Sequence, residues 1–233
     1  MVKGEHNIQG RARLALEWLK EGDVLLDIGC SDGVFISLAR PRCWRAVGLD
    51  VDERTLRRAR QRCPDAEFYR GSADRLPFED NTFSVVSMLD VLEHLPDPVA
   101  ALKEVDRVLH PSGRLILSTP HKGTFDFVDA QRSLLFAAGR KILLNKDDPV
   151  LEHRHFLLKD VIAMLGPGYE VKRLHNGGYL LFPLCGYALM FTDSVNIPAI
   201  SRAIRRLEER DFKRDYGTRS WHLMVEFKKE ASV

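Results

Sequence analysis

A short segment of acids and glycines carries the strongest chemical signal in this sequence. Asp27, Gly29 and Gly33 lie in the run Asp-Ile-Gly-Cys-Ser-Asp-Gly, directly after an apolar stretch. Glycine lets a backbone turn sharply and approach a ligand closely, because no Cβ intrudes. The spacing is GxxxG rather than the GxGxxG of a pyrophosphate-binding turn, and the leading acid would repel a phosphate. The segment therefore favours a cationic, amino-acid-bearing nucleoside over a nicotinamide dinucleotide.

Two further acids follow the next apolar stretches. Asp50 comes about 20 residues after the glycine turn, where a carboxylate commonly accepts hydrogen bonds from both hydroxyls of a ribose. Asp74 could accept a hydrogen bond from the amino group of adenine, while the backbone N–H of Ala73 meets a ring nitrogen. A single aspartate of this kind is as readily a helix cap or a turn residue. The ordered set of acids is what indicates a nucleoside site.

These residues need a scaffold that brings them together. Apolar runs predict strands at 24–28, 44–49, 66–69, 83–89 and 115–118, and amphipathic runs predict helices at 11–20, 33–40, 53–62 and 98–109. A turn is expected at 110–113. Strands that alternate with helices in this way predict a parallel sheet with helices on both faces. Ligands bind at the carboxyl ends of the strands in such sheets, so the acids are expected at one edge.

The second half of the chain is less regular. Helices are predicted at 156–165 and 200–213, and strands at 169–174 and 220–228. The segment 123–146 is interpreted as a helical insertion after the fifth strand, and as a lid over the site.

The first half of the chain resembles the class I S-adenosylmethionine-dependent methyltransferases. The matching pieces are VLLDIGCSDGVF, VGLDVDERTL, GSADRLPFEDNTFSVVSMLDVLEHLPDP and HPSGRLILSTPH, which together cover roughly residues 20–121. One departure is Ser31, where many members carry a second glycine. The resemblance implies an α/β, Rossmann-like, doubly wound sheet of seven strands. Its last strand would be antiparallel, with helices on both faces and the insertion after strand 5.

The resemblance also implies S-adenosyl-L-methionine as cofactor and a set of residues that bind it. These residues are Asp27, Gly29, Cys30, Gly33, Asp50, Val51, Ala73, Asp74 and Leu89. Asp27 and the glycines would line the methionine and ribose portions, and Asp50 the ribose. Ala73 and Asp74 would contact the adenine, and the carbonyl of Leu89 would accept from the methionine ammonium group.

Three polar residues directly follow the fourth predicted strand. Asp90, Glu93 and His94 resemble the E-x-x-E-H pattern of the ubiquinone-biosynthesis O-methyltransferases, with Asp90 in place of the first Glu. On one face of a helical turn they could hold a divalent cation that lowers the pKa of a hydroxyl. Glu93 and His94 could instead cap or brace the turn before Pro96. His94 could also act as a general base, so metal dependence stays open.

Two more histidines are candidates for chemistry. His121 follows the fifth predicted strand, and His153 lies in a Glu-His-Arg-His run before the next helix. Both loops are expected over the strand ends, where a histidine could deprotonate a hydroxyl or bind an acidic group. A surface role, or a role at the entry of a helix, is an equal alternative. The candidate catalytic residues are thus His94, Glu93, His121 and His153.

Composition narrows the partners and the compartment. The 233 residues carry a net charge of +2, which argues against a polyanion partner and so against nucleic acid. Four scattered cysteines without a CxxC pair indicate free thiols of a cytoplasmic protein. The apolar stretch at 177–191 is too short to span a bilayer, which takes about 20 residues, so no transmembrane segment is expected. Buried core, substrate pocket and peripheral membrane contact through 177–214 all remain open for this region.

Taken together, the sequence predicts one methyltransferase domain over 1–233, with a cofactor-binding half at about 20–121 and a substrate and lid half at about 122–215. The leading hypothesis is methyl transfer to a small-molecule acceptor at oxygen, with a carbon or nitrogen acceptor as the next option and a lipophilic substrate as one possibility. One alternative is a nucleic-acid methyltransferase, although the usual Asn/Asp-Pro-Pro-aromatic run is replaced by Leu-Asp-Val-Leu after the fourth strand. The other is a non-catalytic S-adenosylmethionine-binding accessory protein.

Overall fold

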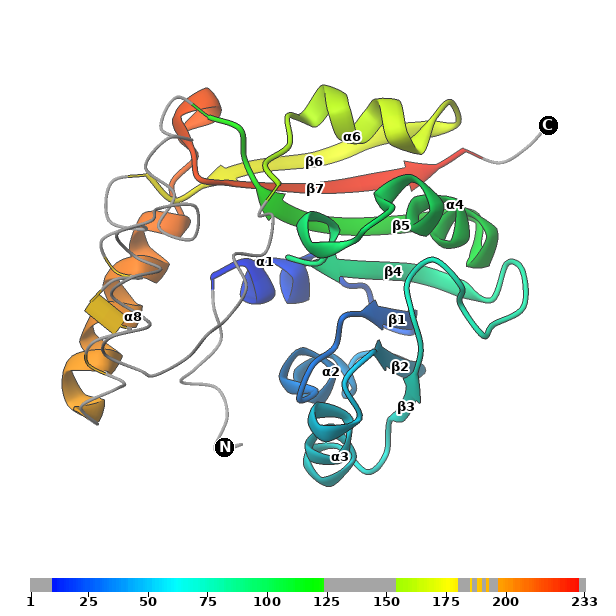
Figure 1. Cartoon of the computed structure of the whole chain (residues 1–233), viewed down its shortest axis with the longest axis horizontal. Helices are drawn as coiled ribbons and strands as arrows, with labels where there is room; N and C mark the ends of the chain where they lie inside the picture. Colours follow the sequence, from blue (N-terminus) through cyan, green and yellow to red (C-terminus); the bar gives the residue numbers. More distant parts are fainter. Residues whose placement is uncertain are drawn as a thin grey trace.

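A computed structural model describes residues 10–123, 154–179 and 197–230, together with Cys185, Ala188, Leu189 and Thr192. In this part of the chain seven strands form one sheet in the order β3-β2-β1-β4-β5-β7-β6 (Figure 1). The strands are β1 (Val24–Ile28), β2 (Arg45–Asp50), β3 (Glu67–Arg70), β4 (Phe83–Leu89), β5 (Leu109–Pro120), β6 (Tyr169–Gly177) and β7 (His222–Lys229). β1 to β5 pair in parallel, and β7 runs antiparallel to both β5 and β6. The predicted seven-stranded sheet with an antiparallel last strand is confirmed.

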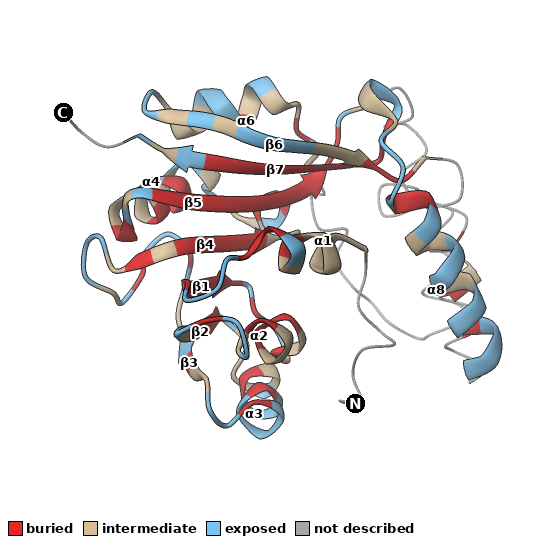
Figure 2. Ribbon diagram, turned by 180° about the vertical axis from the view of Figure 1, so that it is seen from behind, coloured by how far each residue is buried: buried red, intermediate tan, exposed pale blue. Residues whose placement is uncertain are grey.

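Helices cover both faces of this sheet. They are α1 (Gly10–Trp18), α2 (Val34–Ala39), α3 (Glu53–Arg62), α4 (Pro98–Val108) and α6 (Leu158–Leu165), whereas α8 (Pro198–Phe212) lies beside the carboxyl edge of the sheet (Figure 1). Two 3-10 turns are η2 (Leu92–His94) and η4 (Gly217–Arg219). Successive strand residues face opposite ways, so Leu25 packs with α1, α2 and α3 whereas Leu26 packs with α4 and α6. The central strands are almost entirely buried as a result (Figure 2).

One predicted turn is wrong, because the chain at 110–113 belongs to β5. Leu109 pairs with Phe83 and Arg114 pairs with Val85, so the residues between them form a bulge inside the strand. Ser112 supports this bulge with a left-handed φ of +67°. The polar, proline-containing sequence predicts a break in regular pairing, which is present, but pairing resumes on both sides and lengthens the strand.

Several expectations fall outside the described residues. They are the helical insertion at 123–146 beyond Gly123, the candidate His153, and most of the apolar stretch 177–191. Among the helices that the structure does describe, none has both the length and the apolarity needed to cross a membrane.

A buried ion network joins the far ends of the chain at the middle of the sheet. The guanidinium of Arg114 on β5 donates to Asp23 Oδ2, to Glu226 Oε1 on β7 (2.7 Å) and to the carbonyl of Trp18 (2.7 Å). Burial alone would lower the pKa of Arg114, but the two carboxylates outweigh it and raise that pKa. Arg114 therefore stays charged and neutralises both acids. Removing it would leave the buried carboxylate of Asp23 without a counter-ion, while Glu226 would keep only Arg173, whose Nε lies 3.2 Å from its Oε2.

We expect Arg114→Met to lower the free energy of unfolding by about 3–5 kcal/mol, the usual cost of breaking a buried pair from one side. The matched control is Arg45→Met, since Arg45 pairs with Glu67 while both side chains are about 40% exposed. That change should cost less than about 1 kcal/mol. Urea unfolding of both variants measures the difference, and equal losses would contradict the role given to Arg114.

Candidate active site

The loop from β1 to α2 is built on repeated left-handed backbone turns. Gly29, Ser31 and Gly33 have φ angles of +75°, +48° and +74°. The N–H of Gly29 donates to the carbonyl of Leu49 at 2.8 Å, which ties the loop to the end of β2. A Cβ on Gly33 would lie 2.8 Å from the Cβ of Ala59, so α3 can approach only because this residue is glycine. The loop is thereby held against the carboxyl end of the sheet.

Asp50 at the end of β2 holds this loop in place. Its Oδ2 accepts from the N–H of Ser31 at 2.8 Å, and its Oδ1 accepts from the N–H of Asp52 at 2.9 Å. A non-glycine residue in the left-handed region costs about 1–2 kcal/mol, and the bond to Asp50 offsets part of that cost for Ser31. Each carboxylate oxygen retains a second lone pair, so Asp50 can still accept hydrogen bonds from a ligand.

Asp27 on β1 is the most perturbed acid of the loop. It is 3% exposed, and Ser87 on β4 donates to its Oδ1 at 2.7 Å. Burial raises the pKa of Asp27 to about 7, against the lowering effect of Ser87 and with a further rise from the charge of Asp50. A cation placed beside Asp27 would favour its ionised form. Ser87 was missed from sequence, although a serine inside the apolar strand 83–89 is the signal that could have found it.

The other predicted cofactor residues lie at the ends of the neighbouring strands. Val51 follows β2 with its apolar side chain 63% exposed, which leaves a surface on which a flat ring can rest. Ala73 is buried and Asp74 exposed in the turn after β3, and Leu89 is half-buried at the end of β4. Cys30 is buried, and burial raises the pKa of its thiol far above the usual value, so it contributes packing rather than reactivity.

Asp90 lies one residue beyond β4, in a strained conformation with φ +55°. Its Oδ1 accepts from Ser118 Oγ at 2.7 Å, while its Oδ2 pairs with Arg11 of α1 and lies 3.6 Å from His222 Nε2 of β7. Burial alone would raise the pKa of Asp90, but Arg11 and His222 hold it well below the usual value. The ionised form of Asp90 is thus favoured, with Arg11 as its cationic partner.

Glu93 is in the opposite state. It is 1% exposed, Thr119 Oγ1 donates to its Oε2 at 3.3 Å, and its Oε1 has no hydrogen-bond partner among the described residues. Burial and the charge of Asp90 raise the pKa of Glu93 well above the usual value, so folding favours its protonated form. His94, the next residue of the same turn, is exposed.

These positions depart from the expected one-face arrangement of Asp90, Glu93 and His94. The turn is a single 3-10 turn, which buries Glu93 and turns His94 outward, while Asp90 is taken up by Arg11. Within the described ranges, no three histidine, cysteine or acidic side chains converge as metal ligands. The metal interpretation of these three residues gains no support from the geometry.

Of the two candidate histidines that the structure describes, His121 is buried and His94 is exposed. His121 is 7% exposed, just beyond β5, and its Nδ1 lies 2.9 Å from Ser220 Oγ. Burial lowers the pKa of His121, and the charges of His155 and His222 lower it further. The imidazole is therefore neutral near pH 7, as a general base must be. Ser220, His222 and Arg11 were missed from sequence, because they come from the two ends of the chain.

Known proteins resemble this chain mainly in the half that contains the glycine loop and Asp50. Residues 26–117 match a family model described as a methyltransferase domain. A 27-O-demethylrifamycin SV methyltransferase from Amycolatopsis mediterranei is 37% identical over 106 residues, 42% of this chain and 39% of that protein. A ubiquinone biosynthesis O-methyltransferase from Idiomarina loihiensis is 24% identical over 180 residues, 74% of this chain and 71% of that protein.

A solved structure of a SAM-dependent methyltransferase from Methanosarcina mazei superposes with a TM-score of 0.61 at 20% identity, covering 94% of this chain and 98% of that one. This likeness concerns the fold. Several curated relatives are matched over only about 40% of their own length. The sequence match is concentrated in the half that contains the glycine loop, Asp50 and the residues after β4.

The raised pKa of Asp27 predicts how Asp27→Asn changes stability with pH. Because the folded pKa of about 7 lies above the ordinary 3.8, folding favours the protonated form. That contribution is present at low pH and is lost as pH rises towards the folded pKa. The amide cannot ionise, so the variant should gain roughly 2–3 kcal/mol relative to the wild type between about pH 5 and about pH 8.

Urea unfolding of both proteins without ligand at the two pH values measures this gain. Ser84→Ala, which removes a hydroxyl bonded to Asp23 rather than to Asp27, is the matched control and should show a constant difference. A difference for Asp27→Asn that does not change with pH would contradict a titration of this carboxyl near neutrality.

Proposed function

We infer that the chain is a class I S-adenosylmethionine-dependent methyltransferase, because residues 26–117 carry the methyltransferase domain and the acids lie at the strand ends. S-adenosyl-L-methionine is the cofactor of this domain. We propose that the chain transfers a methyl group to a small-molecule acceptor, at an oxygen atom. The observation that carries the proposal is the join of the glycine loop to Asp50, which presents acids where a cationic nucleoside would lie.

The residues present fit this cofactor. Asp50 would accept from the ribose hydroxyls, and exposed Val51 would lie against the adenine, whose amino group Asp74 would contact. Asp27 would face the cationic amino-acid portion, and the carbonyl of Leu89 would accept from its ammonium group. The bound cofactor supplies a methyl group on a sulfonium, whose leaving group is a neutral thioether. The protein therefore needs no acid for the leaving group, and its main task is to align the acceptor.

An acceptor hydroxyl must lose its proton, and we propose His121 as the base. If Nδ1 of His121 donates to Ser220, Nε2 is the nitrogen that takes the proton. Glu93 is less suited to this role because its raised pKa favours the protonated form, and we propose it as a hydrogen-bond donor to the acceptor instead. His94 is exposed and Asp90 has a strongly lowered pKa, which makes a poor base.

The names of two relatives support an oxygen atom as the methyl acceptor. One is a methyltransferase of 27-O-demethylrifamycin SV, and the other is an O-methyltransferase of ubiquinone biosynthesis. Both names describe small molecules, and the second suggests a lipophilic one. We also propose the remaining features in coarser form: one methyltransferase domain with a cofactor half at about 20–121 and an acceptor half at about 122–215, in the cytoplasm. The cysteines in the described residues are free and buried, which supports a reducing compartment.

A peripheral membrane contact through 177–214 is part of the same proposal. Of that region the structure describes α8, whose outer face exposes the large apolar side chains Ile200 and Leu207 next to several arginines. A helix that combines apolar and basic surface is typical of contact with an anionic lipid surface. Such a contact would bring a lipophilic acceptor to the carboxyl edge of the sheet.

Cofactor binding is tested with S-adenosylhomocysteine and differential scanning fluorimetry. At about 100 times its Kd the ligand should raise the Tm of the wild type by about 5–10 °C. Asp50→Ala should weaken binding about tenfold or more, because hydrogen bonds to a charged group are lost. Asp80→Ala is the control, as an exposed acid paired with Arg107 at the opposite end of β4. No shift for the wild type would refute the proposed function.

The role of His121 is tested by transfer of tritium from methyl-labelled S-adenosylmethionine into a small-molecule and lipid extract of cells. His121→Gln should lower the rate about 100- to 10,000-fold while the shift with S-adenosylhomocysteine remains, as expected for loss of a general base. The wild-type rate should fall on the acid side with a midpoint below 6.5, since burial lowers the pKa of His121.

His110→Gln, which changes an exposed histidine of the β5 bulge, is the matched control and should leave the rate unchanged. Full activity of His121→Gln would exclude it as the base. The same extract is also supplemented with RNA and DNA. Recovery of the label only in nucleic acid would show that the acceptor is a nucleic acid and not a small molecule.

A further inference from the structure

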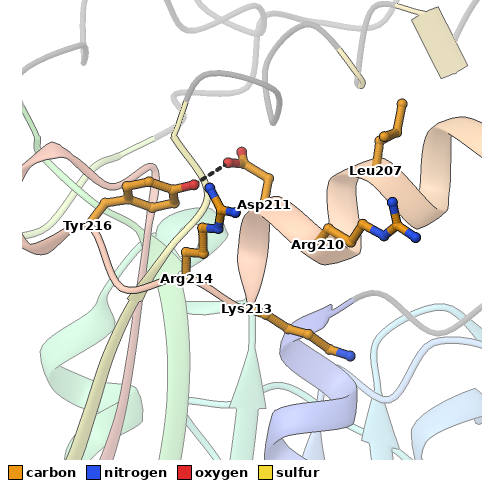
Figure 3. Close-up of a pocket in the computed structure, with 6 residues that line it drawn as sticks. All are labelled: Leu207, Arg210, Asp211, Lys213, Arg214 and Tyr216. Carbon is orange, nitrogen blue, oxygen red and sulfur yellow. Dashed lines mark hydrogen bonds between the residues drawn. The ribbon is translucent and has the colours of Figure 1, made fainter.

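A cavity of about 420 Å³ lies at the C-terminal end of α8, and its lining includes none of the residues of the glycine loop. Leu207, Arg210 and Asp211 of α8 line it together with Lys213, Arg214 and Tyr216 of the following turn (Figure 3). The helix stands beside the carboxyl edge of the sheet rather than on either face (Figure 1). The volume is in the range of small-molecule pockets, which measure about 300–1,000 Å³.

The inner wall of this cavity is fixed by hydrogen bonds. Asp211 is 6% exposed, and its carboxylate accepts from Tyr216 Oη and from the N–H of Tyr179, each at 2.8 Å. The ring centroids of Tyr179 and Tyr216 lie 5.3 Å apart, with the two rings tilted by 30° to each other. His175 of β6 contacts the carbonyl of Phe212 at 2.6 Å, which pins the end of the helix to the sheet. A pocket held in this way binds a ligand without first having to be ordered.

The outer rim of the cavity is basic. Arg210, Lys213 and Arg214 are exposed, whereas Asp211 is turned inward and occupied by its two donors. Lys213 lies 3.6 Å from Glu209, but neither Arg210 nor Arg214 forms an ion pair with any residue that the structure describes. Guanidinium groups bind phosphate and carboxylate in a forked geometry, so two of them on one rim favour an anion with several oxygens.

Helix polarity alone does not explain this arrangement. Cations in the last turn of a helix are stabilised by its dipole, which accounts for Arg210 near the end of α8. The dipole does not require a hollow of ligand size beside them, nor an exposed leucine in its lining. Leu207 is 45% exposed, and Ile200 continues the same side of the helix at 48% exposure. The cavity therefore joins a basic rim to an apolar strip.

We propose that this cavity is a second ligand site, which binds the phosphate group of an amphiphile. Arg210 and Arg214 hold the anion, and Leu207 contacts the start of the apolar chain, which then follows the strip towards Ile200. The site goes beyond methyl transfer, because it recognises a headgroup and not the reacting atom. The same chemistry is offered by a free lipophilic phosphate and by an anionic lipid in a bilayer.

The test uses the full chain and isothermal titration with three probes. They are dihexanoylphosphatidic acid below its micellar concentration, inorganic phosphate, and phosphatidylcholine vesicles with or without phosphatidic acid. Arg210→Gln with Arg214→Gln removes two charges from the rim. Arg202→Gln with Arg206→Gln removes two charges from exposed positions of the same helix outside the cavity, and is the matched control.

We expect the wild type to bind dihexanoylphosphatidic acid, and the rim pair to weaken that binding about tenfold or more while the control pair stays within about twofold. Leu207→Ser should narrow the preference for this probe over inorganic phosphate. Binding of the monomeric probe identifies a free amphiphile as sufficient. Binding only to vesicles with phosphatidic acid, again lost selectively in the rim pair, identifies the bilayer as the source.

Equal losses in the two pairs would overturn the proposal, since they would reflect the bulk charge of the helix. No binding of any phosphate probe by the wild type would overturn it as well. If inorganic phosphate bound as tightly as dihexanoylphosphatidic acid, a contribution of Leu207 and the apolar strip to binding would be excluded. The shift with S-adenosylhomocysteine should be the same in both pairs, which checks the fold and separates failure of this site from failure of methyl transfer.

Discussion

The burial of carboxyl groups at the carboxyl edge of β1 and β4 is the constraint on which the site depends. An isolated carboxylate in the protein interior is costly, so each of these acids must find a cation or keep its proton. Arg11 and His222 lower the pKa of Asp90 and favour its charged form, whereas burial and the charge of Asp90 raise the pKa of Glu93 and favour its protonated form. Asp27 lies between these states, with a pKa of about 7. Three acids of similar chemistry thus take three different roles.

This constraint links the site to both ends of the described chain. The partners of Asp90 come from α1 and β7, and Ser220 beside His121 precedes β7. Arg114 makes a similar connection at the other end of the same strands, where it neutralises Asp23 and Glu226. The antiparallel β7 therefore contributes to both clusters, with His222 from its first position and Glu226 from its interior. A cationic cofactor would place one more positive charge beside Asp27.

Much of the fold and the cofactor half could be predicted from sequence, for physical reasons that are local. Alternating apolar and amphipathic runs specify strands and helices, and the right-handed crossover places the strand ends at one edge. The loop at Gly29 and Gly33 needs left-handed backbone angles, which the glycines announce directly. The prediction of a turn at 110–113 was wrong, because polar residues are typical of irregular backbone both in a turn and in a bulge. The expected common face of Asp90, Glu93 and His94 is not formed, because Asp90 has a left-handed φ and precedes the short 3-10 turn, which buries Glu93 and exposes His94.

The sequence by itself determined the alternation of strands and helices, the glycine loop and the acids that follow the strands. Only the tertiary structure decided which of those acids are charged, since the pKa of a carboxyl depends on burial and on partners distant in the chain. Nothing in the run Leu-Asp-Val-Leu-Glu-His tells Asp90 from Glu93, yet Arg11 reaches one and not the other. Likewise the sequence shows that α8 is rich in arginine, but only the fold brings Arg210 together with Asp211 and Tyr216 in the lining of one cavity. Charge states and cavities arise from contacts across the sheet, which no local pattern records.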